Sequence, residues 1–176
     1  MQKNTYIDEC LRNNKIIRWP DGNKPITFYT APFRWYKAKG EDYKYQQMVI
    51  DALNIWTKAS DGKINFQIVS TLNDSQVNLD WKRVERTSLG HCYFNFDNYG
   101  RLFSAEIQIG LSDGVIHQQY QSEEEVFHTI IHEIGHALGL NHSPFKNDIM
   151  YVPHQYGVVN VTQRDKDTLK WLYRFP

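Results

Sequence analysis

Four side chains within the stretch HEIGHALGLNH, from residue 132 to residue 142, have the types and spacing needed for metal chemistry. His132 and His136 are four positions apart, which places them one above the other on one face of an α-helix. Both imidazoles can then reach a single ion, and zinc suits such ligands. Glu133 is rotated by about 100° around the helix axis, so it can address a water on the metal rather than the metal itself.

The third histidine can join this site only if the helix ends before it. On a continuous helix His142 would point about 240° away from His136 and lie roughly 9 Å farther along the axis. Gly139 stands between them, and glycine adopts the positive φ that turns a chain sharply. We therefore predict a reversal at Gly139 that returns His142 to the ion and leaves one position for water. The alternative is a chance pattern of ordinary core residues.

Three helices must position these residues. Ser122 and Glu125 have the spacing of a capping box, which predicts a helix from about residue 123 to residue 138. Thr162 and Asp165 predict a second helix start, with a helix over about residues 163–173. Apolar residues recur at helical spacing between residues 42 and 59, which indicates an amphipathic helix.

Strands account for most of the remaining chain. Five short segments are rich in β-forming residues and are bounded by turn residues, and together they predict a mixed five-stranded sheet: 25–33, 63–69, 76–81, 89–96 and 102–110. With the helices they make an α+β domain.

The overall composition fits one domain of 176 residues, with a polar arm over residues 1–14 that we expect to be loosely held. The formal net charge of +0 argues against a general nucleic-acid binder. No apolar run is long enough to cross a bilayer, and the N-terminus carries no hydrophobic signal core. Two interpretations stay open: the protein remains inside the cell, or a leader has been removed.

At the histidine motif the chain resembles the metzincin clan of zinc endopeptidases, and most closely the matrixin family in its microbial form. Ser143 directly follows the third histidine, as it does in matrixins. Met150, eight residues past His142, is similar to the methionine of the family's Met-turn, although plain core packing is the alternative.

The resemblance implies a zincin-like fold with a twisted sheet, in which the active-site helix is followed by the Met-turn and a C-terminal helix. It implies one catalytic domain over residues 15–176, with an upper subdomain of about 15–139 and a lower one of about 140–176. Similarity outside residues 132–150 is weaker and lies in the pattern of strands and helices.

The resemblance also implies a function. Zinc on His132, His136 and His142 would activate a water, and Glu133 would act as the general base in peptide-bond hydrolysis. The alternative is a non-catalytic zinc-binding interaction module. We expect a monomer that acts on protein or peptide substrates. Family resemblance favours an extracellular site of action after loss of a leader, with the cytoplasm still open.

An extended substrate would pair with an edge strand and fill a pocket beside the zinc. The resemblance places the strand at Leu89, Gly90, His91 and Cys92, and the pocket for the residue after the cut at Val152, Pro153 and Tyr156.

Several features depart from animal matrixins. The motif of a second, structural zinc is missing, so we expect His91 to be an ordinary edge-strand residue. The turn-like FDNYG, residues 96–100, could supply calcium ligands. Cys10 and Cys92 are either bridged or unrelated thiols. In some relatives a cysteine of an N-terminal segment ligates the zinc and keeps the enzyme inactive, and Cys10 could in principle do the same.

Two other histidines lie near the motif. We expect His128, one helical turn before His132, to be hydrogen-bonded or at the cleft edge. His154 could line the cleft.

Overall fold

The computed structural model describes residues 4–21, 24–33, 41–83, 89–112, 122–155 and 157–174. Its sheet has the strand order β2-β1-β3-β5-β4. The strands are β1 (Ile26–Thr30), β2 (Phe66–Ile68), β3 (Val77–Arg83), β4 (Gly90–Phe96) and β5 (Leu102–Ser112). β4 is antiparallel to β5, whereas the other neighbouring pairs are parallel. The prediction of a mixed five-stranded sheet is confirmed.

Three long helices accompany the sheet: α2 (Glu41–Ala59), α3 (Glu123–Ala137) and α4 (Gln163–Tyr173). Two short elements, the helix α1 (Ile7–Cys10) and the 3₁₀-helix η1 (Leu72–Asp74), were not predicted. They are four and three residues long, too short for a hydrophobic period to reveal. Among the described residues, no helix has the length and apolar character that a membrane span needs.

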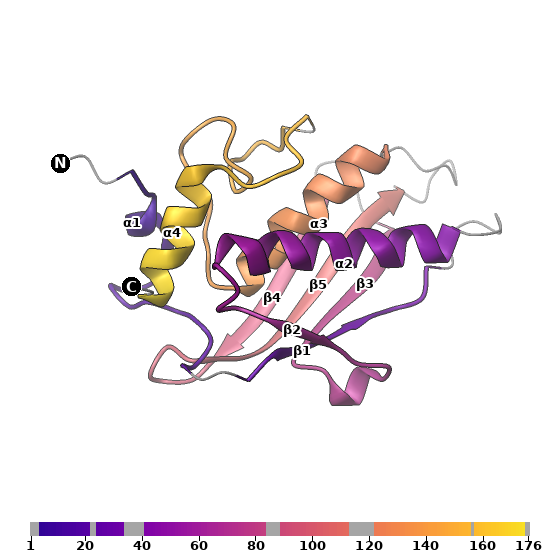
Figure 1. Cartoon of the computed structure of the whole chain (residues 1–176), viewed down its shortest axis with the longest axis horizontal. Coiled ribbons are helices and arrows are strands. Elements are labelled where there is room, and N and C mark those ends of the chain that lie inside the picture. Colours follow the sequence, from indigo (N-terminus) through magenta and orange to yellow (C-terminus); the bar gives the residue numbers. More distant parts are fainter. Residues whose placement is uncertain are drawn as a thin grey trace.

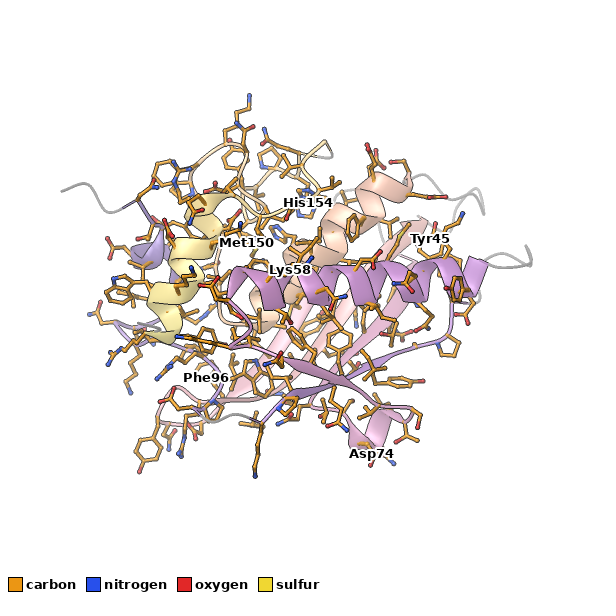
Figure 2. All side chains as sticks on the ribbon, viewed as in Figure 1. Tyr45, Lys58, Asp74, Phe96, Met150 and His154 are labelled. Atoms are coloured by element: carbon orange, nitrogen blue, oxygen red, sulfur yellow. The ribbon has the colours of Figure 1, made fainter. Side chains whose placement is uncertain are left out.

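The core lies between the sheet and the two helices α2 and α3, which run side by side over one face of it (Figure 1). Trp56 of α2 ties the two helices together, because its indole N–H donates to the carbonyl of Ile131 at 2.9 Å. Residues of β3 and β5 alternate between buried and more exposed positions, so one face of the sheet packs on the helices. Figure 2 places Met150 and His154 on the same side of the sheet as these helices.

The predicted capping box at Ser122 is present, and the helix start predicted at Thr162 is a capping box as well. Ser122 Oγ accepts from the backbone N–H of Glu125 at 3.2 Å, and the Glu125 carboxylate accepts from the N–H of Ser122 at 3.0 Å. Thr162 and Asp165 make the same reciprocal pair at the start of α4. These caps satisfy N–H groups that a helix start leaves open, and they fix where α3 begins relative to the histidines that it carries.

The described part of the N-terminal segment, which includes α1, is packed against α4, so the expectation of a loosely held arm is wrong there. Tyr6 and Cys10 are buried. The hydroxyl of Tyr6 donates to Asp165 at 2.6 Å, and its backbone N–H donates to Thr168 Oγ1 at 3.1 Å. The polar composition of residues 1–14 hides the few apolar side chains that make this contact. Where the arm ends and the catalytic domain begins stays a prediction.

Candidate active site

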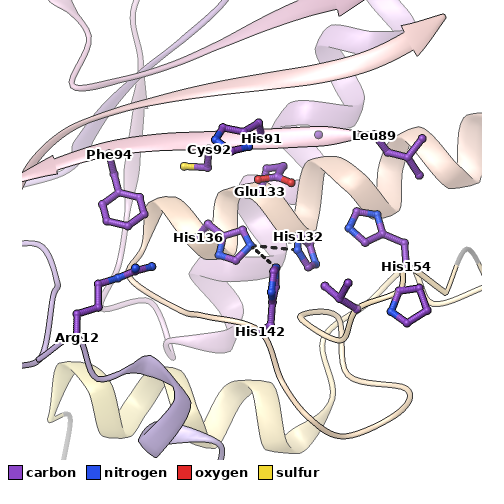
Figure 3. A pocket seen from close by; sticks show the side chains of 13 residues that line it. Arg12, Leu89, His91, Cys92, Phe94, His132, Glu133, His136, His142 and His154 are labelled. Carbon is purple, nitrogen blue, oxygen red and sulfur yellow. Dashed lines mark hydrogen bonds between the residues drawn. The ribbon is translucent and has the colours of Figure 1, made fainter. Parts of the chain in front are cut away.

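Three imidazole nitrogens converge at the end of α3. The Nε2 atom of His136 lies 3.1 Å from Nε2 of His132 and 3.1 Å from Nε2 of His142 (Figure 3). Tetrahedral zinc with nitrogen ligands at about 2.0–2.1 Å holds those nitrogens about 3.3 Å apart. The structure therefore brings the three predicted ligands together at a spacing that fits one zinc ion.

Two of these imidazoles, those of His132 and His136, are oriented by hydrogen bonds on their Nδ1 atoms. His132 Nδ1 lies 2.8 Å from the carbonyl of Ile149, and His136 Nδ1 lies 2.9 Å from the carbonyl of Leu140. Because a carbonyl can only accept, each Nδ1 carries the hydrogen and each Nε2 keeps its lone pair for a metal. Burial lowers the pKa of His132, and it lowers that of His136 to about 3. Both rings are thus neutral near pH 7, the form in which imidazole binds zinc.

The chain reverses at Gly139, as predicted. This residue has φ +101°, and the N–H of Leu140 closes the helix end on the carbonyl of Gly135 at 3.1 Å. A side chain at position 139 would also collide with the backbone carbonyl of Ile17. Glycine is therefore required both by the backbone conformation and by the chain packed against it.

After the reversal, a tight loop brings Met150 back beneath α3. The backbone N–H of Ser143 donates to the carbonyl of Met150 at 2.9 Å, and Ser143 Oγ donates to Asp148 at 2.6 Å. Asp148 is buried and also accepts from Thr162 at 2.7 Å and from Arg164 at 3.2 Å. These bonds anchor the loop to the start of α4, so the fully buried Met150 has a fixed place.

Helix α4 also supports the first histidine through one carboxylate. Asp165 Oδ2 accepts from the backbone N–H of Ile149 at 2.9 Å, and the carbonyl of the same Ile149 accepts from His132. Asp165 was predicted only as a helix cap. Its second role could not be read from the sequence, because the partners are remote in the chain.

Glu133 lies beside the histidines and lines the same cleft. It is buried, and within the described chain its Oε2 atom has no hydrogen-bond partner. Burial raises the pKa of Glu133 to about 8. A carboxyl group in such a place is poised to exchange a proton near neutral pH.

Gly90 of β4 stands directly over this carboxyl group. A Cβ at Gly90 would lie 2.9 Å from Glu133 Oε1 and 2.6 Å from Thr129 Cγ2. The edge strand can approach α3 this closely only because position 90 has no side chain.

The cleft has a volume of about 640 Å³. Of the residues predicted to bind substrate, the structure places six on its walls: Leu89, Gly90, His91, Cys92, Val152 and Pro153. Tyr156 lies outside the described residues. The ring of His91 is exposed and packs on Tyr93, with the ring centroids 4.2 Å apart. Arg12, Phe94 and His154 also line the cleft, and of these only His154 was considered from the sequence.

His128 is buried and hydrogen-bonded, with Nδ1 2.6 Å from the carbonyl of Val158. Together with His132 and His154 it forms a second group of nitrogens close enough for a metal. His132 belongs to both groups, and its Nδ1 is already bonded to a carbonyl. The one remaining lone pair of His132 cannot bind two ions. In the group with His136 and His142, the Nε2 atoms of His132 and His142 each lie 3.1 Å from Nε2 of His136.

The remaining expectations concern cysteines and calcium. Cys10 and Cys92 are free, so they form no bridge. Cys10 Sγ accepts from the backbone N–H of Asn141 at 3.4 Å rather than facing the histidines, which does not support a silencing role. The Asp97 carboxylate accepts from the N–H groups of Tyr99 and Arg101, so its own turn uses it and calcium gains no support.

Comparison with known proteins agrees with this geometry. A family model described as matrixin matches residues 19–174. The chain is 33% identical over 151 residues to a probable matrix metalloproteinase, 095L, of Invertebrate iridescent virus 3, covering 79% of this chain and 38% of that protein. It is 28% identical over 139 residues to a putative matrix metalloproteinase of Heliothis virescens ascovirus 3e, covering 66% of this chain and 28% of that protein.

A plant relative is more distant. The chain is 24% identical over 168 residues to metalloendoproteinase 1 of Glycine max, covering 89% of this chain and 52% of that protein. The chain therefore spans between about a quarter and a half of the length of these relatives. Because the family match runs through nearly all of the described fold and includes the histidine site, this chain belongs to the matrixin family.

Proposed function

We propose that this chain is a zinc-dependent endopeptidase that hydrolyses peptide bonds of extended protein substrates. Membership of the matrixin family implies zinc and supports a metalloendopeptidase. The observation that carries the proposal is the convergence of three neutral imidazoles beside Glu133, a buried carboxyl group that is not needed as a ligand. No feature of the described residues favours a non-catalytic binding module.

His132, His136 and His142 hold the metal in the proposed mechanism, and the bound zinc supplies an activated water and polarises the peptide carbonyl. Glu133 accepts the proton of the attacking water and then donates it to the departing amine. Its buried position beside the three histidines suits this exchange, because no hydrogen bond within the described chain occupies its Oε2 atom. The hydrogen bonds of His132 Nδ1 and His136 Nδ1 to backbone carbonyls keep these two ligands in place while the proton moves.

The substrate chain lies along β4 in this proposal. β4 pairs with β5 on one side, and within the described chain no strand pairs with its other side, which borders the cleft. An extended peptide can therefore add itself to the sheet through backbone hydrogen bonds. Gly90 brings the strand close to Glu133, and Val152 and Pro153 line the same cleft, where the residue after the cut would lie.

The test is cleavage of casein and of a mixed peptide library by the purified protein with one equivalent of zinc, in the presence and absence of 1,10-phenanthroline. We expect cleavage that the chelator abolishes. Glu133→Gln should bind zinc normally and lose about two to four orders of magnitude in rate. Glu124→Gln is the matched control, because Glu124 is an exposed residue of the same helix. Cleavage by Glu133→Gln at the rate of the control contradicts the proposal.

A further inference from the structure

One cation, Arg12, enters the cleft from the N-terminal segment. It lines the cleft together with His136 and His142, at the end opposite Leu89 and His154 (Figure 3). Its guanidinium carbon lies 4.7 Å above the centre of the Phe94 ring. In the part of the chain that the structure describes, no carboxylate forms an ion pair with it. The cleft therefore contains a half-buried positive charge, and no carboxylate of the described residues pairs with it.

The backbone holds Arg12 firmly in this place. Arg12 and Lys15 exchange two backbone hydrogen bonds of 2.9 Å across Asn13 and Asn14. Both asparagines have positive φ, 50° and 61°, which is the geometry of a tight type I′ turn. Just before the turn, Cys10 Sγ accepts from the N–H of Asn141 at 3.4 Å. The backbone of Arg12 is thus positioned relative to the loop that carries the third histidine.

Arg12 shares the wall of the cleft with the metal-binding histidines His136 and His142. A cation fixed between apolar walls attracts an anion more strongly than one in open water, because the surroundings screen it less. Packing on Phe94 occupies one face of the guanidinium and leaves its edge N–H groups free to bind a carboxylate in a bidentate way.

We propose that Arg12 forms a subsite for an acidic side chain of the substrate, on the N-terminal side of the bond that is cut. This inference rests on the proposed endopeptidase function. The residue after the cut is expected at Val152 and Pro153, which directly precede His154 in the chain and line the same cleft. Arg12 lies at the end of the cleft opposite His154 (Figure 3). The subsite therefore selects Glu or Asp before the cut.

The strand sets the distance from the cut. Gly90 is beside Glu133, and Phe94 is four residues farther along β4. Four residues of a strand span about 13 Å at about 3.3 Å per residue. A paired peptide covers that span with a similar number of residues, and Arg12 reaches back from Phe94 toward the histidines (Figure 3). The acidic residue thus lies about two to four residues before the cut.

The test uses one fluorogenic peptide in which Glu, Gln or Lys is placed in turn two, three and four residues before the cut. For the wild type we expect kcat/KM to be about tenfold higher with Glu than with Gln at one of these positions, as a hydrogen-bonded charge pair provides. Arg12→Gln should abolish this ratio, and Arg12→Glu should reverse it in favour of Lys. The reversal also shows that the variant is folded. Arg101→Gln is the control, because Arg101 also packs on an aromatic ring but lies outside the cleft.

Binding separates this inference from the proposed function. The Glu133→Gln protein is mixed with the same peptides carrying a fluorescent label, and anisotropy measures their affinity with and without Arg12→Gln. Tighter binding of the Glu peptide, lost on Arg12→Gln, supports the subsite even if the wild type cleaves nothing, a result that would contradict the endopeptidase alone. Cleavage or binding that does not distinguish Glu from Gln at any position, or that Arg12→Glu leaves unchanged, overturns the subsite. The subsite is also overturned if no peptide is cleaved by the wild type and no peptide binds to the Glu133→Gln protein.

Discussion

The sulfur of Met150 lies against Gly135, the α3 residue directly before His136. A Cβ on Gly135 would be 2.5 Å from Met150 Sδ and 2.9 Å from Trp56 Cζ2. Gly135 is therefore required because other side chains approach the helix there, not because of its own backbone conformation. This contact links the loop after the third histidine to the helix that carries the first two.

Gly135→Ala tests this contact. The added methyl group should force Met150 or Trp56 to move, and we expect the free energy of unfolding to fall by about 1–3 kcal/mol. Met150→Ala leaves a cavity and should cost about 2–5 kcal/mol. In the double variant the smaller residue at 150 makes room for the alanine, so urea denaturation of the metal-free proteins should give a loss smaller than the sum. Strictly additive losses would contradict direct packing between the two residues.

Gly139→Ala should be more damaging than Gly62→Ala. Both glycines have positive φ, 101° and 78°, so alanine is strained at either position. A Cβ at Gly62 meets no atom within 4 Å, whereas one at Gly139 collides with the carbonyl of Ile17. We expect the free energy of unfolding to fall by about 1–2 kcal/mol for Gly62→Ala, and by about 3 kcal/mol or more for Gly139→Ala. Equal losses in urea denaturation would show that the contact with Ile17 is unimportant.

Gly90→Ala should impair catalysis without removing the metal. The new methyl group would press on Glu133 and Thr129, since the distances to their atoms are 2.9 Å and 2.6 Å. We expect kcat to fall by about tenfold or more, because a proton acceptor displaced by a fraction of an ångström is poorly aligned. Zinc content by mass spectrometry should stay at the wild-type level. Gly157→Ala, where a Cβ meets nothing within 4 Å, is the control. Unchanged kcat in Gly90→Ala would refute this positioning.

The stability of the metal-free protein should depend on pH through Glu133. Burial raises the pKa of Glu133 from 4.5 to about 8, so between these values the folded state binds more protons than the unfolded state. Stability from this group is therefore complete below pH 4.5 and is lost as the pH rises through 8, by up to about 1.4 kcal/mol per pH unit. Urea denaturation with a chelator at pH 5, 6.5 and 8 should show wild type losing stability relative to Glu133→Gln. Parallel curves for the two proteins would contradict the raised pKa.

Local patterns were enough to predict the elements that carry the site. The spacing of His132, Gly139 and His142 defines a helix, a break and a return, and the structure has all three. The capping residues Ser122 and Thr162 predicted the starts of α3 and α4 at the observed residues. Each of these signals lies within a few residues of the feature that it determines, which is why sequence alone reveals it.

Contacts between remote residues could not be predicted in this way. Arg12 enters the cleft because α1 packs on α4. Tyr6, directly before α1, donates a hydrogen bond to Asp165, 159 positions away. The need for glycine at positions 90 and 135 comes from side chains of other elements. A lone glycine in a strand or helix carries no local sign of its neighbour, so only the three-dimensional structure assigns these roles.

The most direct test of the central claim is anomalous X-ray diffraction at the zinc absorption edge, from crystals grown with one equivalent of zinc. We predict one strong peak at about 2.0–2.1 Å from the Nε2 atoms of His132, His136 and His142, with its open side toward Glu133. The account is contradicted if no peak lies among these three nitrogens, or if the zinc is bound by His128 and His154 instead.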